Sequence, residues 1–407
     1  MRKLLLPLSL ISCLLFTDGR AQIVTTAAYF LRIPTSATIN SMGRSGVALQ
    51  FNDPFLALDN PAFMASFSSQ TNLVYGSQYS TLFPELRGNL SLNNQAVAAG
   101  INLESLTNLP MKVQFTYTRR FFNLGENVRT TETGEELGRY FSYETANSIT
   151  ASVSYKYGAE WFLGAGYTRI YSRLNPFPAD EDKDGISSGN AFSFGLLSRL
   201  PFHEWYTWAD TEDQFYPEYF LNLGMSVLNK GDKLIYIDPV QADPLPKMAK
   251  IGYSVVFNYN LKYENTFLNL ASFQWSADVN DLLVKRSSEF TMDYIDFPGD
   301  INVFKHVIGL KKDDAIELHR GYSINLLETV TIMQGWDDQI GFGETKTYGQ
   351  VYSTSGLFKY LTGFTDNVIL KNVLAESAIT YSVSGVKSRL TTGTVYKGFS
   401  ANFGFTF

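Results

Sequence analysis

The sequence predicts an all-β protein, a transmembrane antiparallel β-barrel of about fourteen strands with an N-terminal hatch segment inside it. Three observations predict this fold. Many segments alternate between apolar and polar residues, the chain ends in a strand of alternating aromatic residues, and no apolar run long enough for a membrane helix follows the first twenty or so residues, although 45% of the residues are hydrophobic. A barrel strand changes environment at every residue, so its apolar residues are diluted by polar ones.

The chain begins with a signal for export. Arg2 and Lys3 precede an apolar stretch at 4–16, and Ala21 is a small residue suited to cleavage before Gln22. We therefore expect residues 1–21 to be a secretory signal peptide that is absent from the fold.

Loss of the signal also settles the cysteine count and the charge. The one cysteine, Cys13, lies within it, so the mature chain has no thiol for disulfides, catalysis or metal binding. The apolar run continues after Cys13, which argues against a lipoprotein cleavage box at this position. Removal of three basic residues and one acidic residue changes the formal charge from −6 to −8, and this balance gives nucleic-acid binding no support.

Residues 22–65 do not alternate, and we expect them to form the hatch. Glycines that permit close packing and Asx-Pro pairs that set turns punctuate short apolar patches there. The residues that carry this pattern are Met42, Gly43, Gly46, Asp53, Pro54, Asn60, Pro61 and Ala62. The remaining residues, 66–407, are expected to form the barrel.

Strands follow from the period-two alternation. Apolar residues from Ile149 to Tyr157 alternate with Thr150, Ser152, Ser154 and Lys156. We expect similar strands at 111–118, 161–168, 219–227 and 379–384, and near 71–79, 95–103, 190–199, 246–257, 265–277, 302–311, 313–324, 328–337 and 347–359. Outer-membrane barrels use an even number of strands, so we predict fourteen. A soluble sandwich or propeller would tend to show a repeated period, which this chain lacks.

The last strand runs from Phe399 to Phe407, with aromatic residues on one face. Its terminal Phe407 resembles an outer-membrane insertion signal. The plainer interpretation, a strand with aromatic residues at the membrane interfaces, also implies a barrel.

The less apolar face of the strands presents Thr, Ser, Gly, Asn and Gln, which favours a wet or plugged interior; Phe162, Ile170 and Phe220 break the pattern. Polar, turn-rich stretches at 121–146, 174–189, 200–218, 229–245 and 278–300 are expected to be loops, the longer ones extracellular. The aromatic stretch 202–216 is interpreted as a loop at the membrane interface or as a binding surface.

The hatch pattern resembles the FadL superfamily of outer-membrane proteins. The matching runs are Met42-Gly43-Arg44-Ser45-Gly46-Val47-Ala48, Asp53-Pro54 and Asn60-Pro61-Ala62. The sequence departs from the family pattern at Ser41, where a glycine is usual, and at Asp59, where an aromatic residue is usual. The resemblance implies an integral outer-membrane barrel with an internal hatch.

Three further stretches narrow the resemblance. Residues 115–126, 167–174 and 223–237 are similar to the PorV (LptO) branch, whose barrels serve the type IX secretion system. That resemblance implies binding of secreted cargo through its C-terminal signal domain, and of translocon and attachment-complex partners. The alternatives are a FadL-like transporter of hydrophobic small molecules and a purely structural or adhesive barrel.

Little in the sequence indicates catalysis, and we expect no enzyme. His203, His306 and His319 are the available imidazole bases, and no Gly-x-Ser-x-Gly motif accompanies them. Arg119 and Arg120 form a strand-end cluster that suits lipopolysaccharide phosphates or membrane anchoring.

Asp180, Asp182 and Asp184, followed by Gly185, place three carboxylates around a turn as a calcium loop does. Ala191 stands where an EF-hand needs a bidentate glutamate. The run is therefore an incomplete Ca²⁺ loop or a solvated acidic loop, and no other cofactor is expected.

Overall fold

The computed structural model describes residues 26–63, 71–82, 90–180, 183–206, 214–236, 242–263, 266–286, 292–340, 343–387 and 392–405. The predicted signal peptide and Phe407 lie outside these residues.

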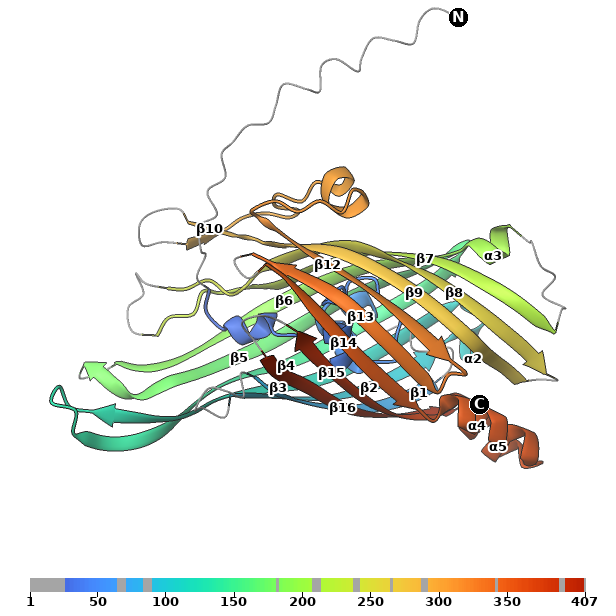
Figure 1. The fold of residues 1–407 in the computed structure, drawn as a ribbon, viewed down its shortest axis with the longest axis horizontal. Helices are drawn as coiled ribbons and strands as arrows, with labels where there is room; N and C mark the ends of the chain where they lie inside the picture. Colours follow the sequence, from blue (N-terminus) through green and yellow to red (C-terminus); the bar gives the residue numbers. More distant parts are fainter. Residues whose placement is uncertain are drawn as a thin grey trace, which may run out of the picture.

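Fourteen antiparallel strands close into a barrel (Figure 1), which confirms the predicted fold class and strand number. Consecutive strands pair, β9 pairs with β12, and β1 closes on β16 with Thr71 opposite Phe405. The barrel strands are β1 (Thr71–Thr81), β2 (Ser91–Asn102), β3 (Met111–Thr130), β4 (Glu136–Tyr157), β5 (Ala159–Asp180), β6 (Lys183–Pro201), β7 (Phe215–Gly231), β8 (Met248–Tyr263), β9 (Thr266–Leu282), β12 (Ile316–Leu326), β13 (Val330–Gln339), β14 (Gly343–Ser353), β15 (Ala378–Lys387) and β16 (Thr392–Phe405).

The alternation in the sequence determines which side chains face outward. Ile149 and Phe115 are 58% and 60% exposed, whereas Thr150 and Thr116, one residue further along each strand, are buried. Successive side chains of a strand point to opposite faces, so the barrel exposes its apolar residues and turns its polar ones inward. None of the helices in the described part of the chain is long and apolar enough to cross a membrane.

The two ends of the barrel differ, and Figure 1 shows both. At the end where β16 finishes, here called the helical end, the connections carry α2 (Glu104–Thr107), α3 (Phe202–Trp205), α4 (Ser355–Leu361), η6 (Thr362–Phe364) and α5 (Val368–Glu376). At the opposite hairpin end, the β3–β4 and β5–β6 hairpins extend beyond the other strands. The small hairpin β10 (Val284–Arg286) and β11 (Met292–Tyr294) and the π-helical turn η5 (Val303–Ile308) also lie there, between β9 and β12.

Several predicted loops and one predicted strand were wrong. The stretches 121–146 and 174–189 are mostly strand, because β3 with β4 and β5 with β6 keep pairing far past the barrel wall. The strand predicted at 302–311 is the turn η5, which begins where the Asn302 side chain accepts a hydrogen bond from Lys305 N. The stretch 200–218 joins β6 to β7 at the helical end, so it cannot share a membrane side with the hairpin-end loops.

Residues 26–63, here called the inner segment, lie inside the barrel (Figure 1). They contain η1 (Tyr29–Arg32), α1 (Ala37–Ser41) and η2 (Pro54–Leu58), and most of their side chains are buried. The described inner segment adds no strand to the barrel, so side chains and turns hold it in place.

Candidate functional site

The inner segment packs against a wall of small residues. A side chain at Gly321 would come within 2.5 Å of Met42 O, one at Gly335 would meet Gly43 N, and one at Gly164 would meet Pro61. Inward glycines therefore let the backbone of the inner segment approach the strands closely. Between the segment and β3–β6 lies a space of about 20 Å³, roughly room for one water.

The glycines of the predicted hatch motif serve this packing. Gly43 has a φ of +63°, which favours glycine, and its own missing side chain would meet the backbone of Arg320 and Trp336. A side chain at Gly46 would lie 2.8 Å from the Asp59 carboxyl carbon. Met42 beside them is fully buried.

The Asx-Pro pairs form the turns that the sequence predicts. Asp53 Oδ1 accepts a hydrogen bond from Phe55 N at 3.0 Å, which caps η2, and Pro54 is the first residue of η2. Burial raises the pKa of Asp53.

Asn60 ties the second turn to the wall. Its Nδ2 donates to Val47 O at 2.8 Å and to Leu196 O of β6 at 3.1 Å, while its Oδ1 accepts from Ala62 N at 3.1 Å. One side chain thus binds the inner segment to itself and to the barrel.

Apolar contacts hold the inner segment toward the hairpin end. Phe30 of η1 stacks on Phe122 of β3 with ring centroids 6.0 Å apart. Arg120 points inward and donates to Phe30 O at 2.7 Å and Ile33 O at 3.0 Å, so it holds the segment rather than a lipid phosphate. Arg119 faces outward. Ile170, which broke the alternation, packs in the same cluster.

A row of three buried titratable side chains crosses the wall behind the inner segment. His319 of β12 lies between Asp278 of β9 and Asp337 of β13, which are its partners in the strand register. His319 Nδ1 is 3.0 Å from Asp278 Oδ1, and its Nε2 is 3.1 Å from Asp337 Oδ1. Directly opposed residues on one sheet face interact in this way.

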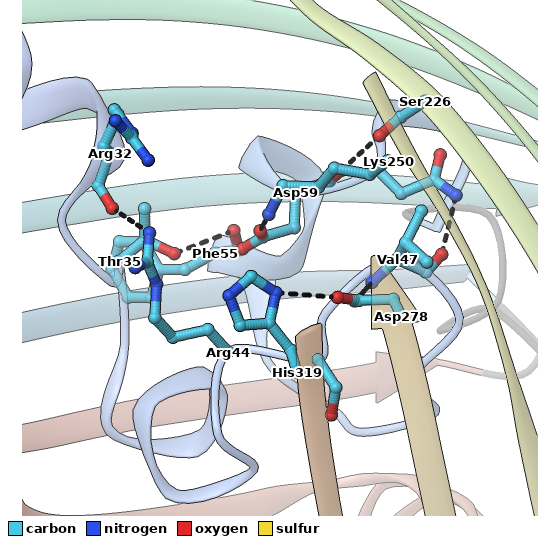
Figure 2. A network of polar contacts seen from close by, with 12 residues as sticks. Arg32, Thr35, Arg44, Val47, Phe55, Asp59, Ser226, Lys250, Asp278 and His319 are labelled. Carbon is cyan, nitrogen blue, oxygen red and sulfur yellow. Dashed lines mark hydrogen bonds and ion pairs between the residues drawn. The ribbon is translucent and has the colours of Figure 1, made fainter. Parts of the chain in front are cut away.

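The inner segment supplies groups that pair with this charged wall (Figure 2). Val47 N donates to Asp278 Oδ2 at 3.1 Å, and Arg44 lies 3.6 Å from Asp337 Oδ2. Charges taken out of water need such partners.

Two further ion pairs extend the contact. Arg32 Nη2 is 2.6 Å from Glu317 Oε1 of β12, and Lys250 of β8 contacts Asp59, the position where the sequence departs from the family pattern. Ser226 Oγ of β7 donates to Asp59 O at 2.8 Å. Asp59, which replaces the aromatic residue usual in the family pattern, thus has a basic partner, Lys250, on the barrel wall.

The helical end is open and polar by contrast. A cavity of about 610 Å³ lies between residues 50–52 of the inner segment, strands β7, β8, β9, β12 and β13, and Lys359 of α4. A second cavity of about 320 Å³, lined in part by Lys112, Glu160 and Arg199, adjoins it at Glu218. An apolar cluster therefore packs around the inner segment toward the hairpin end, and two cavities lie toward the helical end.

The three histidines have no serine partner among the described residues. His203 contacts Tyr219 O, His306 contacts Asp313, and His319 contacts Asp278, so their partners are carboxylates and a backbone carbonyl. These are not the serine pairs that a hydrolase would need. Among the described residues, no group of three or more His, Cys, Asp or Glu is placed to hold a metal ion.

The Ca²⁺ loop predicted at Asp180, Asp182 and Asp184 is the tip of the β5–β6 hairpin. Asp182 and the side chains of Asp180 and Asp184 lie outside the described residues.

The sequence analysis named His319 but missed the acidic residues around it. Asp278, Glu317, His319 and Asp337 are ionisable residues at inward positions of strands whose inward residues are otherwise mostly small or neutral. That mismatch is the signal that could have found them, because an isolated charge in a barrel interior needs a partner.

No family model and no curated protein matches the chain. Among solved structures, the Pseudomonas putida toluene transporter TodX is 11% identical over 91% of this chain and 98% of its own, with a TM-score of 0.41. A Pseudomonas aeruginosa FadL homologue is 12% identical over 92% of this chain and 99% of its own, with a TM-score of 0.39. The translocator domain of the Neisseria meningitidis autotransporter NalP is 10% identical over 84% and 89%, with a TM-score of 0.36. No conclusion about activity follows from these values.

Proposed function

We propose that the protein is an integral outer-membrane β-barrel of the FadL type that passes small molecules through its lumen, with the inner segment as its gate. The observation that carries this proposal is the division of the lumen. A segment outside the strand ladder lies between an apolar cluster toward the hairpin end and a cavity of about 610 Å³ at the helical end.

The outer surface supports the membrane location. Large apolar side chains that are 36–78% exposed occur on the outward face of β1 to β9 and of β12 to β16. A continuous apolar surface of this kind is unusual on a soluble monomer and typical of a barrel in lipid.

The contacts between the inner segment and the barrel wall support gating. Its contacts with the wall are side-chain hydrogen bonds, ion pairs and packing, so it can shift without breaking the hydrogen bonds that close the barrel. Asn40 Nδ2, for example, donates to Ser384 Oγ of β15 at 3.0 Å.

A disulfide between these two positions tests the gate. Because Cys13 lies in the signal, the double variant Asn40→Cys/Ser384→Cys would contain the only two thiols of the mature chain. In liposomes, oxidation should reduce solute flux and reduction should restore it, while the single variants Asn40→Cys and Ser384→Cys should not respond. Equal flux through the oxidised, verified cross-linked protein and the reduced protein would contradict gating by the inner segment.

A second candidate function is protein binding in type IX secretion. The observation that favours it is the β3–β4 hairpin, which projects beyond the barrel (Figure 1) and carries exposed Val128, Leu137 and Phe141. Shortening this hairpin should then remove co-purifying secretion partners from native membranes and leave solute flux unchanged. Loss of flux without loss of partners would support the transporter instead.

A further inference from the structure

Part of the chain between β9 and β12 lies on the outside of the barrel. Residues 295–315, here called the outer strap, contain η5, which contacts β8 and β9 (Figure 1). Lys250, Asp278 and Glu317 face the inner segment, so their neighbours along the same strands point outward. The wall residues that pack with the strap all occupy such outward positions and are at most 4% exposed: Ala249, Val279, Ile316 and Leu318.

The same face of these strands is exposed beyond the strap. Toward the helical end, Val255 of β8, Phe273 of β9 and Ile324 of β12 are 45%, 42% and 43% exposed. Side chains on one face of a strand recur at every second residue, so these residues and those under the strap belong to one apolar surface. In the membrane location proposed above, the strap therefore replaces lipid on this part of the wall.

A carboxylate also lies under the strap. Asp281 of β9 occupies an outward position opposite Ile316, yet it is only 3% exposed. Its Oδ2 accepts a hydrogen bond from Asp300 N of the strap at 2.5 Å. A carboxylate that faced acyl chains without a partner would be costly, so the strap supplies a hydrogen bond that lipid cannot.

The strap is apolar on both of its sides. Ile301 and Val307 pack on the wall and are 7% and 6% exposed. On the other side, Val303, Phe304 and Ile308 are 44%, 81% and 64% exposed. A turn on a protein surface in water normally carries polar residues on its free side. The free side of η5 instead continues the apolar character of the wall around it.

Two lysines flank this free side. Lys305 lies within η5, Lys311 follows it by three residues, and both are exposed. Lysines beside a lipid-facing surface bury their methylene chains and keep their ammonium groups among the headgroups. The lysines therefore place η5 at the boundary between headgroups and acyl chains.

We propose that the free side of the outer strap, formed by Val303, Phe304 and Ile308, binds the lipid bilayer and anchors the hairpin end of the barrel in it. The continuity of this surface with the lipid-facing wall favours lipid over a protein partner. The inference rests on the membrane location in the proposed function, and it does not depend on transport or on the gate.

A spin label on Phe304→Cys tests the proposal in proteoliposomes of phosphatidylcholine and phosphatidylglycerol that contain the full-length barrel. Oxygen concentrates among acyl chains, whereas a nickel chelate stays in water, so collision with each reports the surroundings of the label. We expect the oxygen-to-nickel ratio at Phe304 to match that of a label on the outward Ile149→Cys. It should exceed about fivefold the ratio at Glu135→Cys, which is exposed on the β3–β4 hairpin.

A charged double variant tests the anchor without a label. Phe304→Asp/Ile308→Asp leaves the residues that pack on the wall in place, and in proteoliposomes it should speed tryptic cleavage after Lys305 about tenfold, because carboxylates leave the acyl chains. The matched control is Val128→Asp/Leu137→Asp, which changes two exposed apolar residues of the β3–β4 hairpin and should not alter this cleavage. Heat-dependent gel migration would verify that each variant folds as a barrel.

The outcomes separate the two proposals. If the labels at Ile149 and Phe304 both collide mainly with nickel, the membrane location itself is wrong. If only the Phe304 label does so, or if Phe304→Asp/Ile308→Asp is cleaved at the wild-type rate, the lipid contact of the strap is overturned and the membrane location stands. A Phe304 label shielded from both reagents in native membranes alone would show that a protein covers this surface instead.

Discussion

His319 and Asp278 face each other across β12 and β9 inside the barrel, with His319 Nδ1 3.0 Å from Asp278 Oδ1 and both side chains fully buried. The second oxygen of Asp278 accepts Val47 N of the inner segment at 3.1 Å. One carboxylate therefore joins two neighbouring strands to the inner segment.

Asp278→Asn should loosen the inner segment. The substitution keeps the size of the side chain but removes the charge that pairs with His319, and breaking a buried pair of this kind typically costs about 3–5 kcal/mol. We expect faster tryptic cleavage after Arg44, which is only 6% exposed in the folded protein, and a larger conductance in planar bilayers. Asp293→Asn is the control, because its ion pair with Lys233 lies at the surface and should matter little. Unchanged cleavage in both variants would contradict a role for Asp278 in holding the gate.

Gly321→Val should displace the inner segment by steric conflict alone. A Cβ at Gly321 would lie 2.5 Å from Met42 O, and a branched side chain needs still more room. The expected readout is again cleavage after Arg44, together with an intact barrel by gel migration. Gly363→Val provides the matched control, since a Cβ there meets nothing within 4 Å.

The loop between β11 and β12, residues 303–315, should become less stable in acid. Burial alone would raise the pKa of Asp313, but hydrogen bonds from Lys305 Nζ at 2.8 Å and Ala315 N at 3.2 Å, with the nearby His306, hold it below its usual value. A lowered pKa means that ionised Asp313 stabilises the loop above pH 4 or so, and that this contribution is lost as the pH falls further. Hydrogen exchange of residues 303–315, relative to β13, should show this loss.

Asp313→Asn supplies the control for that experiment. It should reduce the acid dependence, because the amide does not titrate in this range. Wild-type protection that stays constant from pH 6 to pH 3 would refute the assignment.

The helices α4 and α5 should lie in the membrane interface. Phe364, Val368 and Ile369 are 72%, 68% and 77% exposed, and α5 packs against β16, whose outward face is apolar. An amphipathic pair beside a lipid-facing wall can bury these residues among the acyl chains. A fluorophore on Ile369→Cys should shift to the blue in proteoliposomes and be quenched by brominated lipids. The same label on Thr133→Cys, at the exposed tip of the β3–β4 hairpin, should remain in water.

Alternation allowed the barrel to be predicted because successive residues of each strand face the outside and the inside of the barrel in turn. Ile149 and Thr150 take opposite faces as expected, and the number of strands is right. The same rule failed at 302–311, where Asn302 caps a helical turn, and at 121–146, where polar residues continue a strand in water. Polarity indicates what surrounds a residue, and it does not determine whether the backbone stays extended.

The contacts that hold the gate could not be predicted in the same way. The hatch motif predicted close packing at Gly43 and a turn at Asn60-Pro61, since both features depend on neighbouring residues. The pairing of Arg32 with Glu317 joins residues 285 positions apart, and it depends on the register of β12 against β9 across the β10–β11 excursion. A single sequence contains no local signal for such a register.

The separation of these partners along the chain constrains the order of assembly. The inner segment is made first, but Glu317 and Asp337, which pair with its arginines, belong to strands that follow β9, and Ser384 comes later still. Those pairs cannot form until the last third of the chain is present. The inner segment therefore gains these partners only once the strands from β12 onward are in place, and a chain truncated before β12 would leave the two arginines without them.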